Sequence, residues 1–383
     1  MAGKRSARTP SALLAVILAA WILSAPGSAA AFGTILGGGQ NREHERITRA
    51  ALACPSGTSS NGACFEARSL DRLAGHDREF GGVGAPDSDE LRTFSAHCDD
   101  ADFLPAGYPR TREQATGALL ECVDHLRARF REAVDGAPNL LDAEGRIDPR
   151  EVDLEPECRF FDVAERRAKC ASLEGIGRLL HGVQDFYSHS NWADEADPSR
   201  PVGPENPPGL DRPGPSPMLD LRGDTTPAVP DDLTTGCFVL RDEVVGVADC
   251  AGRVTHAGLN KDRGLIDPVT GLTTEPTTPR GMVKENFAKA VTGAIEETRR
   301  QWRDVQSELI ERYGEERAAA MICSLTRDDP ATACLAIDTL VDQARDNVSG
   351  GRRTVVLPIV LAVVGICLVA AVIVLRVRSR RTK

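Results

Sequence analysis

Apolar side chains recur every three or four residues along several long stretches of this chain. In residues 112–134, Leu119, Val123, Leu126 and Phe130 would lie on one face of a helix. Runs that alternate apolar and polar residues, as strands do, do not occur, so the predicted fold class is all-α. The same helical spacing is found in residues 41–53 (with Asn41 as the expected N-cap), 163–190, 285–313, 315–326 and 331–346.

A proline-rich segment interrupts the helical pattern. Residues 198–232 contain ten prolines, which fix φ and remove backbone donors, so a helix is excluded there. The segment is either a long surface loop or a flap beside a site. Because nothing divides the rest of the body into two cores, we expect one helical domain from residue 32 to residue 346, followed by a linker at 347–353.

Both ends of the chain have the pattern of sorting signals. Residues 1–31 combine three basic residues, a short apolar stretch and three final alanines, which predicts a signal peptide cleaved before Phe32. Residues 354–375 carry no charge over 22 positions and predict a transmembrane helix; the alternative is a second buried helix. Five basic residues at 376–383 would hold the tail in the cytoplasm. We therefore expect a single-pass protein of the cell membrane with its body outside the cell.

Charge narrows the choice of partners. Without the eight basic residues at its two ends, the chain has 38 basic against 56 acidic residues, a net charge of −18. Such a body repels phosphate backbones, and aromatic residues make up only 4% of the chain. We therefore expect no general nucleic-acid binding.

The cysteines agree with an external body. Ten of the eleven precede the predicted membrane segment, and an even number outside the cell favours disulfides. A zinc site of four cysteines is the rival interpretation, but no Cys-x-x-Cys pair occurs. Pairing of neighbours along the chain would join Cys54 with Cys64, Cys98 with Cys122, Cys158 with Cys170, Cys237 with Cys250, and Cys323 with Cys334.

Three polar residues in the 163–190 helix carry the first signal of chemistry. His181, Asp185 and His189 follow one another in steps of four, so they lie on a stripe about 80° wide. Two imidazoles and a carboxylate on one stripe suit zinc. The alternatives are a stripe that faces solvent and a buried histidine hydrogen-bonded to Asp185. Gly175, Gly177 and Gly182 in the same helix would let other backbone approach closely.

The run HGVQDFYSHSNW that contains this stripe resembles the signature of the Het-C family, which is related to the zinc-dependent phospholipase C and nuclease superfamily. Further segments match in the expected order over residues 44–262. They are HERITRAAL with His44, GAPDSDE with Asp87, SAHCDD with His97 and Asp99, and HAGLNKD with His256.

The resemblance implies an all-helical fold around a cluster of two or three zinc ions. Asp185 would bridge two of them, one held also by His97 and His181 and the other by His44. The full set of implied ligands is His44, His97, Asp99, His181, Asp185, His189, His256 and the free amine of the mature N-terminus at Phe32.

The chain departs from the soluble enzymes of the superfamily in two places. Only three residues separate Asp185 from His189, which is a tighter spacing than those enzymes have. A glutamate expected four residues after His256 is replaced by Asn260, and Asp262 would have to substitute for it in a third site.

The chemistry that the resemblance implies is metal-assisted hydrolysis of a phosphodiester. Zinc ions lower the pKa of water and neutralise a phosphoryl group, and Asp87 would orient or deprotonate the attacking water. Asp87 could instead be a turn residue after Pro86. The expected function is a membrane-anchored extracellular phospholipase C-like hydrolase acting on phospholipid or another phosphodiester. The alternatives are a non-catalytic Het-C-like recognition ectodomain with a structural metal, and a nuclease of the same superfamily, which the charge disfavours.

Overall fold

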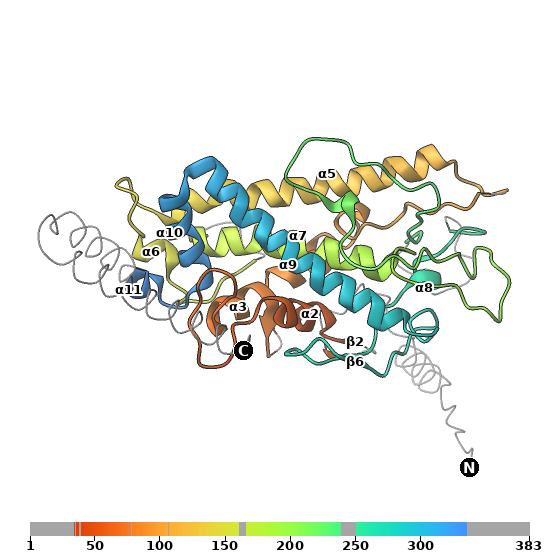
Figure 1. The fold of residues 1–383 in the computed structure, drawn as a ribbon, viewed down its shortest axis with the longest axis horizontal. Coiled ribbons are helices and arrows are strands. Elements are labelled where there is room, and N and C mark those ends of the chain that lie inside the picture. Colours follow the sequence, from red (N-terminus) through yellow and green to blue (C-terminus); the bar gives the residue numbers. More distant parts are fainter. Residues whose placement is uncertain are drawn as a thin grey trace, which may run out of the picture. The chain divides into compact units, whose positions relative to one another are not determined.

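The computed structural model describes residues 34, 36–37, 40–77, 79–105, 107–160, 166–238 and 250–334 (Figure 1). This part of the chain is rich in helices, as predicted. The main helices are α2 (Glu43–Leu52), α5 (Arg112–Gly136), α7 (Ala168–His189), α9 (Asn286–Tyr313) and α10 (Glu315–Thr326). The shorter helical segments are α3 (Ala67–Ala74), α4 (Pro86–Asp89), α6 (Pro149–Val152), α8 (His256–Leu259), α11 (Pro330–Ala333), and the 3₁₀ turns η1 (Gly82–Gly84), η2 (Phe94–Ala96), η3 (Ala137–Leu140) and η4 (Pro217–Leu219).

Helix α7 lies at the centre of the fold and packs against α5, α9 and η1. Its predicted apolar positions, which include Leu173, Ile176 and Val183, are fully buried. Every other residue of α7 except Ala171 is buried as well. Because a charged group is rarely buried without a partner, the histidines and the aspartate on this helix must be satisfied inside the protein.

The glycines of α7 permit the close packing that the sequence predicts. A Cβ at Gly177 would lie 2.2 Å from the backbone of Gly82, and one at Gly182 would lie 2.6 Å from the carbonyl oxygen of Ala96. A Cβ at Gly175 would meet the backbone nitrogen of Ala133 on α5 at 2.9 Å. The backbones of η1, η2 and α5 therefore contact α7 directly, and this close approach determines where the residues after η1 and η2 lie.

Several details differ from the sequence-based predictions. Helix α2 is capped by Arg42, which has φ 56°, and not by Asn41, which belongs to strand β2. Helix α3 was not predicted, because it is only eight residues long. Three antiparallel hairpins also escaped prediction, since strands of two residues show no alternating pattern; they pair β1 (Leu36–Gly37) with β2 (Gln40–Asn41), β3 (Gly75–His76) with β4 (Glu79–Phe80), and β5 (Leu265–Ile266) with β6 (Thr273–Thr274).

All ten cysteines for which the sequence predicts disulfides are disulfide-bonded. Four of the bonds join Cys54 with Cys64, Cys98 with Cys122, Cys158 with Cys170, and Cys237 with Cys250. Cys323 and Cys334 are disulfide-bonded too. The proline-rich segment 198–232 contains no α-helix, as expected, and only the short turn η4 interrupts its irregular path.

Several predictions concern residues outside the described ranges. These are the signal peptide at 1–31, the amine of Phe32, most of the predicted helix at 331–346, the linker, the membrane segment at 354–375 and the tail. Among the residues that are described, no helix has the length and apolar character needed to cross a membrane.

Candidate metal centre

Three histidines from three separate segments surround Asp185, and we call these four residues the first group. Asp185 Oδ2 lies 2.9 Å from His97 Nδ1 and 3.0 Å from His181 Nε2. Asp185 Oδ1 lies 3.2 Å from His44 Nε2. The ring of His181 stacks on that of His44 with their centroids 4.2 Å apart. Helices α2 and α7 and the loop after η2 thus bring together four residues that the sequence predicted as ligands.

Neighbouring groups decide which nitrogen of each ring faces Asp185. The backbone carbonyl of Val83 in η1 accepts a hydrogen bond from His181 Nδ1 at 2.8 Å, so the proton of a neutral His181 ring lies there. The amide nitrogen of Gln184 donates to Thr48 and Thr298, so its oxygen accepts from His44 Nδ1 at 2.8 Å. When neutral, both rings therefore direct the lone pair of Nε2 towards the carboxylate of Asp185, as metal-bound histidines do.

This arrangement could hold a metal ion. His44 and His181 are completely buried, as is Asp185, and lone pairs on nitrogen and oxygen would repel one another at these distances. Tetrahedral ligands about 2.0–2.1 Å from a zinc ion lie about 3.3 Å apart, close to the separations between these nitrogens and oxygens. The donor set and its spacing both fit zinc.

The pKa values in the first group follow from burial and from Asp185. Burial would raise the pKa of Asp185, but His181, His189 and His44 outweigh it and hold that pKa well below the usual range. Burial lowers the pKa of His181. Burial also opposes a charge on His97, yet Asp185 raises the pKa of His97 to about 9. Asp185 is therefore ionised and His181 neutral, the states that bind metals. Asp185 also raises the pKa of His44, so a metal ion would compete with protons on His44 and His97.

A second group forms where α7 ends, and it consists of Asp99, His189, His256 and Asp262. Asp99 Oδ1 lies 3.2 Å from His189 Nδ1 and 3.3 Å from His256 Nδ1. Asp262 Oδ1 lies on the other side of His189, 3.5 Å from its Nε2. His189 is fully buried, and neither of its ring nitrogens makes a hydrogen bond. A buried imidazole without hydrogen bonds beside a carboxylate is a good candidate for a metal ligand.

The electrostatics of the second group resemble those of the first. Burial would raise the pKa of Asp99, but His189 and His256 lower it to about 2. Burial would lower the pKa of His189, but Asp99 and Asp185 raise it well above the usual range. Asp262, which the sequence offered only as a substitute for a missing glutamate, lies within the group and also accepts a hydrogen bond from Ser188.

A short segment supplies one ligand to each group. His97 belongs to the first group and Asp99 to the second, and the residue between them, Cys98, has φ 53°. A non-glycine residue in this left-handed region costs about 1 kcal/mol or more. The disulfide to Cys122 on α5 fixes this conformation, which turns the two ligands towards different groups.

The two groups open onto one narrow cavity. It is lined by Asp87 and His97, by residues of the second group, and by the apolar side chains of Leu91 and Phe238. About 10 Å³ of this cavity is open to the centre of a water molecule, which is room for about one water. His97 is the residue of the first group in this lining, whereas Asp99, His189 and His256 of the second group all belong to it.

Asp87 lies at the edge of this cavity, where the sequence predicted a catalytic base. Its Oδ2 accepts a hydrogen bond from Thr34. Its Oδ1 is buried, makes no hydrogen bond and lies 3.8 Å from His181 Nε2. Asp87, His97 and His181 also offer atoms close enough to share an ion, so the geometry allows Asp87 to act as a ligand as well as a base.

Two other clusters of candidate ligands lack the features of these groups. At the surface, the guanidinium of Arg72 already lies against His76 and Glu157, next to Glu79. In the other cluster, Asp100 and Asp102 are paired with arginines, and Cys237 is in a disulfide.

Sequence reasoning missed the residues that orient the ligands. Gln184 lies at a buried position of α7. A polar residue at such a position is a detectable signal in the sequence. The backbone carbonyl of Val83 leaves no signal in the sequence, because every residue has a backbone carbonyl.

Comparisons with family models, with curated proteins and with solved structures found no match to this chain. The resemblance to the Het-C family therefore stays a prediction, and the chemistry assigned to the two groups rests on their own geometry.

Proposed function

We propose that this protein is a zinc-dependent phosphodiester hydrolase with phospholipase C-like chemistry. The observation that carries the proposal is the buried carboxylate of Asp185, which faces three imidazole nitrogens at 2.9–3.2 Å. Nitrogen and oxygen donors at this spacing favour zinc over calcium and magnesium, which prefer oxygen ligands. Two groups of histidines and aspartates beside one cavity would hold two or three ions.

His44, His97, His181 and Asp185 would hold the ions of the first group, and Asp99, His189 and His256 the ion of the second. When bound, such ions neutralise the charge of a phosphoryl group and make a nearby water more acidic. Asp87 Oδ1 reaches the same cavity and has no hydrogen bond, so it can accept a proton from the attacking water. Thr34, only two residues after the predicted mature end at Phe32, holds the other oxygen of Asp87 in place.

Replacing Asp87 with Asn tests the role of this carboxylate. The amide keeps the shape and the contact with Thr34 but cannot accept the proton, so hydrolysis of a chromogenic phosphodiester should slow by about 10²–10⁴-fold. The zinc content should stay at the value of the unmodified protein. Loss of zinc together with activity would make Asp87 a ligand, and unchanged activity would remove it from the mechanism.

The proposed substrate is a phospholipid head group, because the predicted anchor would keep the body beside a lipid surface. The net charge of −18 on the body disfavours nucleic acid. A non-catalytic recognition ectodomain is the second candidate, and the near-complete burial of both groups beside a narrow cavity favours it. That protein would bind zinc but hydrolyse no phosphodiester, whether phosphatidylcholine in vesicles or a soluble analogue.

The proposal includes an external body on a single membrane helix. Protease added to intact cells should degrade the body and leave a membrane-embedded fragment of a few kilodaltons, detected with a C-terminal tag. The disulfides support this location, since they persist in oxidising compartments. Full protection of the body, with digestion only after lysis, would reverse the topology.

A further inference from the structure

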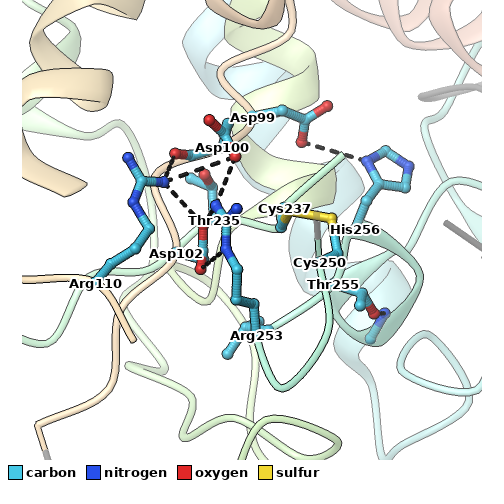
Figure 2. Close-up of a disulfide and its surroundings, with 12 residues drawn as sticks. Asp99, Asp100, Asp102, Arg110, Thr235, Cys237, Cys250, Arg253, Thr255 and His256 are labelled. Atoms are coloured by element: carbon cyan, nitrogen blue, oxygen red, sulfur yellow. Dashed lines mark hydrogen bonds and ion pairs between the residues drawn. A yellow bond between two sulfur atoms is a disulfide. The ribbon is translucent and has the colours of Figure 1, made fainter. Parts of the chain in front are cut away.

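A network of charged side chains joins the two segments that carry Asp99 and His256 (Figure 2). Its centre is Asp102, whose side chain is fully buried. Arg253 binds both oxygens of Asp102, through Nε at 2.9 Å and Nη2 at 2.5 Å. Arg110 donates to Asp102 Oδ1 at 2.9 Å, and Tyr108 donates to Oδ2. Charge-assisted bonds to a bidentate carboxylate are the strongest class of hydrogen bond in proteins.

The positions of these residues in the sequence show which segments the network holds together. Arg253 lies three residues before His256, and Asp100 and Asp102 closely follow Asp99. Arg253 Nη2 also contacts Asp100 Oδ1 at 2.7 Å. One guanidinium therefore links both ligand-bearing segments.

A third segment of the chain, which contains Gly236 and Cys237, lies between these two segments. The carbonyl of Gly236 accepts from the backbone nitrogen of Asp100 at 2.8 Å, and the carbonyl of Cys237 accepts from that of His256 at 2.9 Å. A Cβ at Gly236 would lie 2.3 Å from the Cα of His256, so this packing requires glycine. A disulfide also joins Cys237 of this segment to Cys250, three residues before Arg253, as Figure 2 shows.

We propose that Arg253 is a positioning residue of the second group, which fixes the 3.3 Å approach of Asp99 to His256 before a cation binds. The inference rests on the proposed metal function of that group. Asp100 and Asp102 balance the charge of Arg253 together with that of Arg110. The contribution of Arg253 is therefore the alignment of two ligands, which otherwise would have to be ordered when the cation binds.

Titration of cobalt(II) into the metal-stripped, full-length protein tests this role. Cobalt reports its coordination through its visible absorption, so binding to each group can be followed without any enzymatic assay. In Arg253→Met, the second group should bind cobalt about 10–100-fold more weakly, while the first group keeps its affinity. In Arg253→Lys the charge remains but the planar guanidinium is lost, so a smaller loss of cobalt affinity in the second group is expected. This variant tests the role if Arg253→Met does not fold.

The matched control is Arg127→Met, which removes a buried arginine that donates to the carbonyl of Thr225 and lies in neither group. It should lower stability without changing either cobalt affinity. Wild-type affinities in both Arg253 variants would overturn the positioning role, as would equal weakening of the two groups. If the unmodified protein binds no cobalt, the proposed metal function fails and this inference fails with it. That result differs from failure of the positioning role alone, in which the unmodified protein binds cobalt and the Arg253 variants bind it equally well.

Discussion

Replacing Asp185 with Asn should remove at least one zinc ion from the protein. Asp185 is the carboxylate that the three histidines of the first group share, and it is fully buried. The amide keeps the shape but removes the negative charge that offsets the cations, so two ions held close together would repel each other. Zinc content by mass spectrometry, measured on the folded variant, should fall by one or two ions per chain, and phosphodiester hydrolysis should fall below detection.

The control for this substitution is His125→Ala. His125 lies on α5 near Glu90 and belongs to none of the groups of converging ligand atoms among the described residues. His76 is less suitable, because it forms such a group with Glu79 and Glu157. The control should keep its zinc. If Asp185→Asn also keeps the full amount, Asp185 does not bridge two ions, and the His181 to His189 stripe is then a buried hydrogen-bonded face.

Replacing Gly177 with Ala should destabilise the fold by about 1–3 kcal/mol, because a side chain there overpacks the contact between α7 and η1. The new Cβ would lie 2.2 Å from backbone of Gly82, which cannot rotate away as a side chain would. Moving η1 would also withdraw the carbonyl of Val83 from His181 Nδ1. Urea unfolding should show the lower stability, and the zinc affinity of the folded fraction should fall as His181 loses its fixed orientation.

Gly117→Ala is the matched control, since Gly117 lies in helix α5 and a Cβ there meets no atom within 4 Å. Alanine favours a helix over glycine, so this variant should gain up to about 1 kcal/mol. Equal stability of Gly177→Ala and the unmodified protein would mean that η1 does not pack on α7 as described.

The sequence predicted the long helices well, for a physical reason. Leu173, Ile176 and Val183 repeat at the period of a helix, and a buried helix with His181 and Asp185 on one face needs partners for them. The remaining candidates were found through the order of short motifs along the chain. The structure brings the described ones together in two groups.

Other features depend on contacts between distant segments and left no pattern in the sequence. The orientation of His181 depends on a backbone carbonyl from η1, and the approach of Asp99 to His256 depends on Arg253 and Gly236. Asparagine favours the N-cap position and so predicts Asn41 there, but Asn41 pairs with Leu36 in the β1–β2 hairpin and Arg42 occupies the N-cap position of α2. Tertiary contacts outweigh local preference at such positions.

The zinc content of the purified full-length protein tests the central claim most directly. After exhaustive dialysis against metal-free buffer, inductively coupled plasma mass spectrometry should find two or three zinc ions per chain. These ions would occupy the first group around Asp185 and the second group around His189. A protein that is folded, retains its disulfides and contains no zinc or other transition metal would contradict the account, for the hydrolase and for the structural-metal alternative alike.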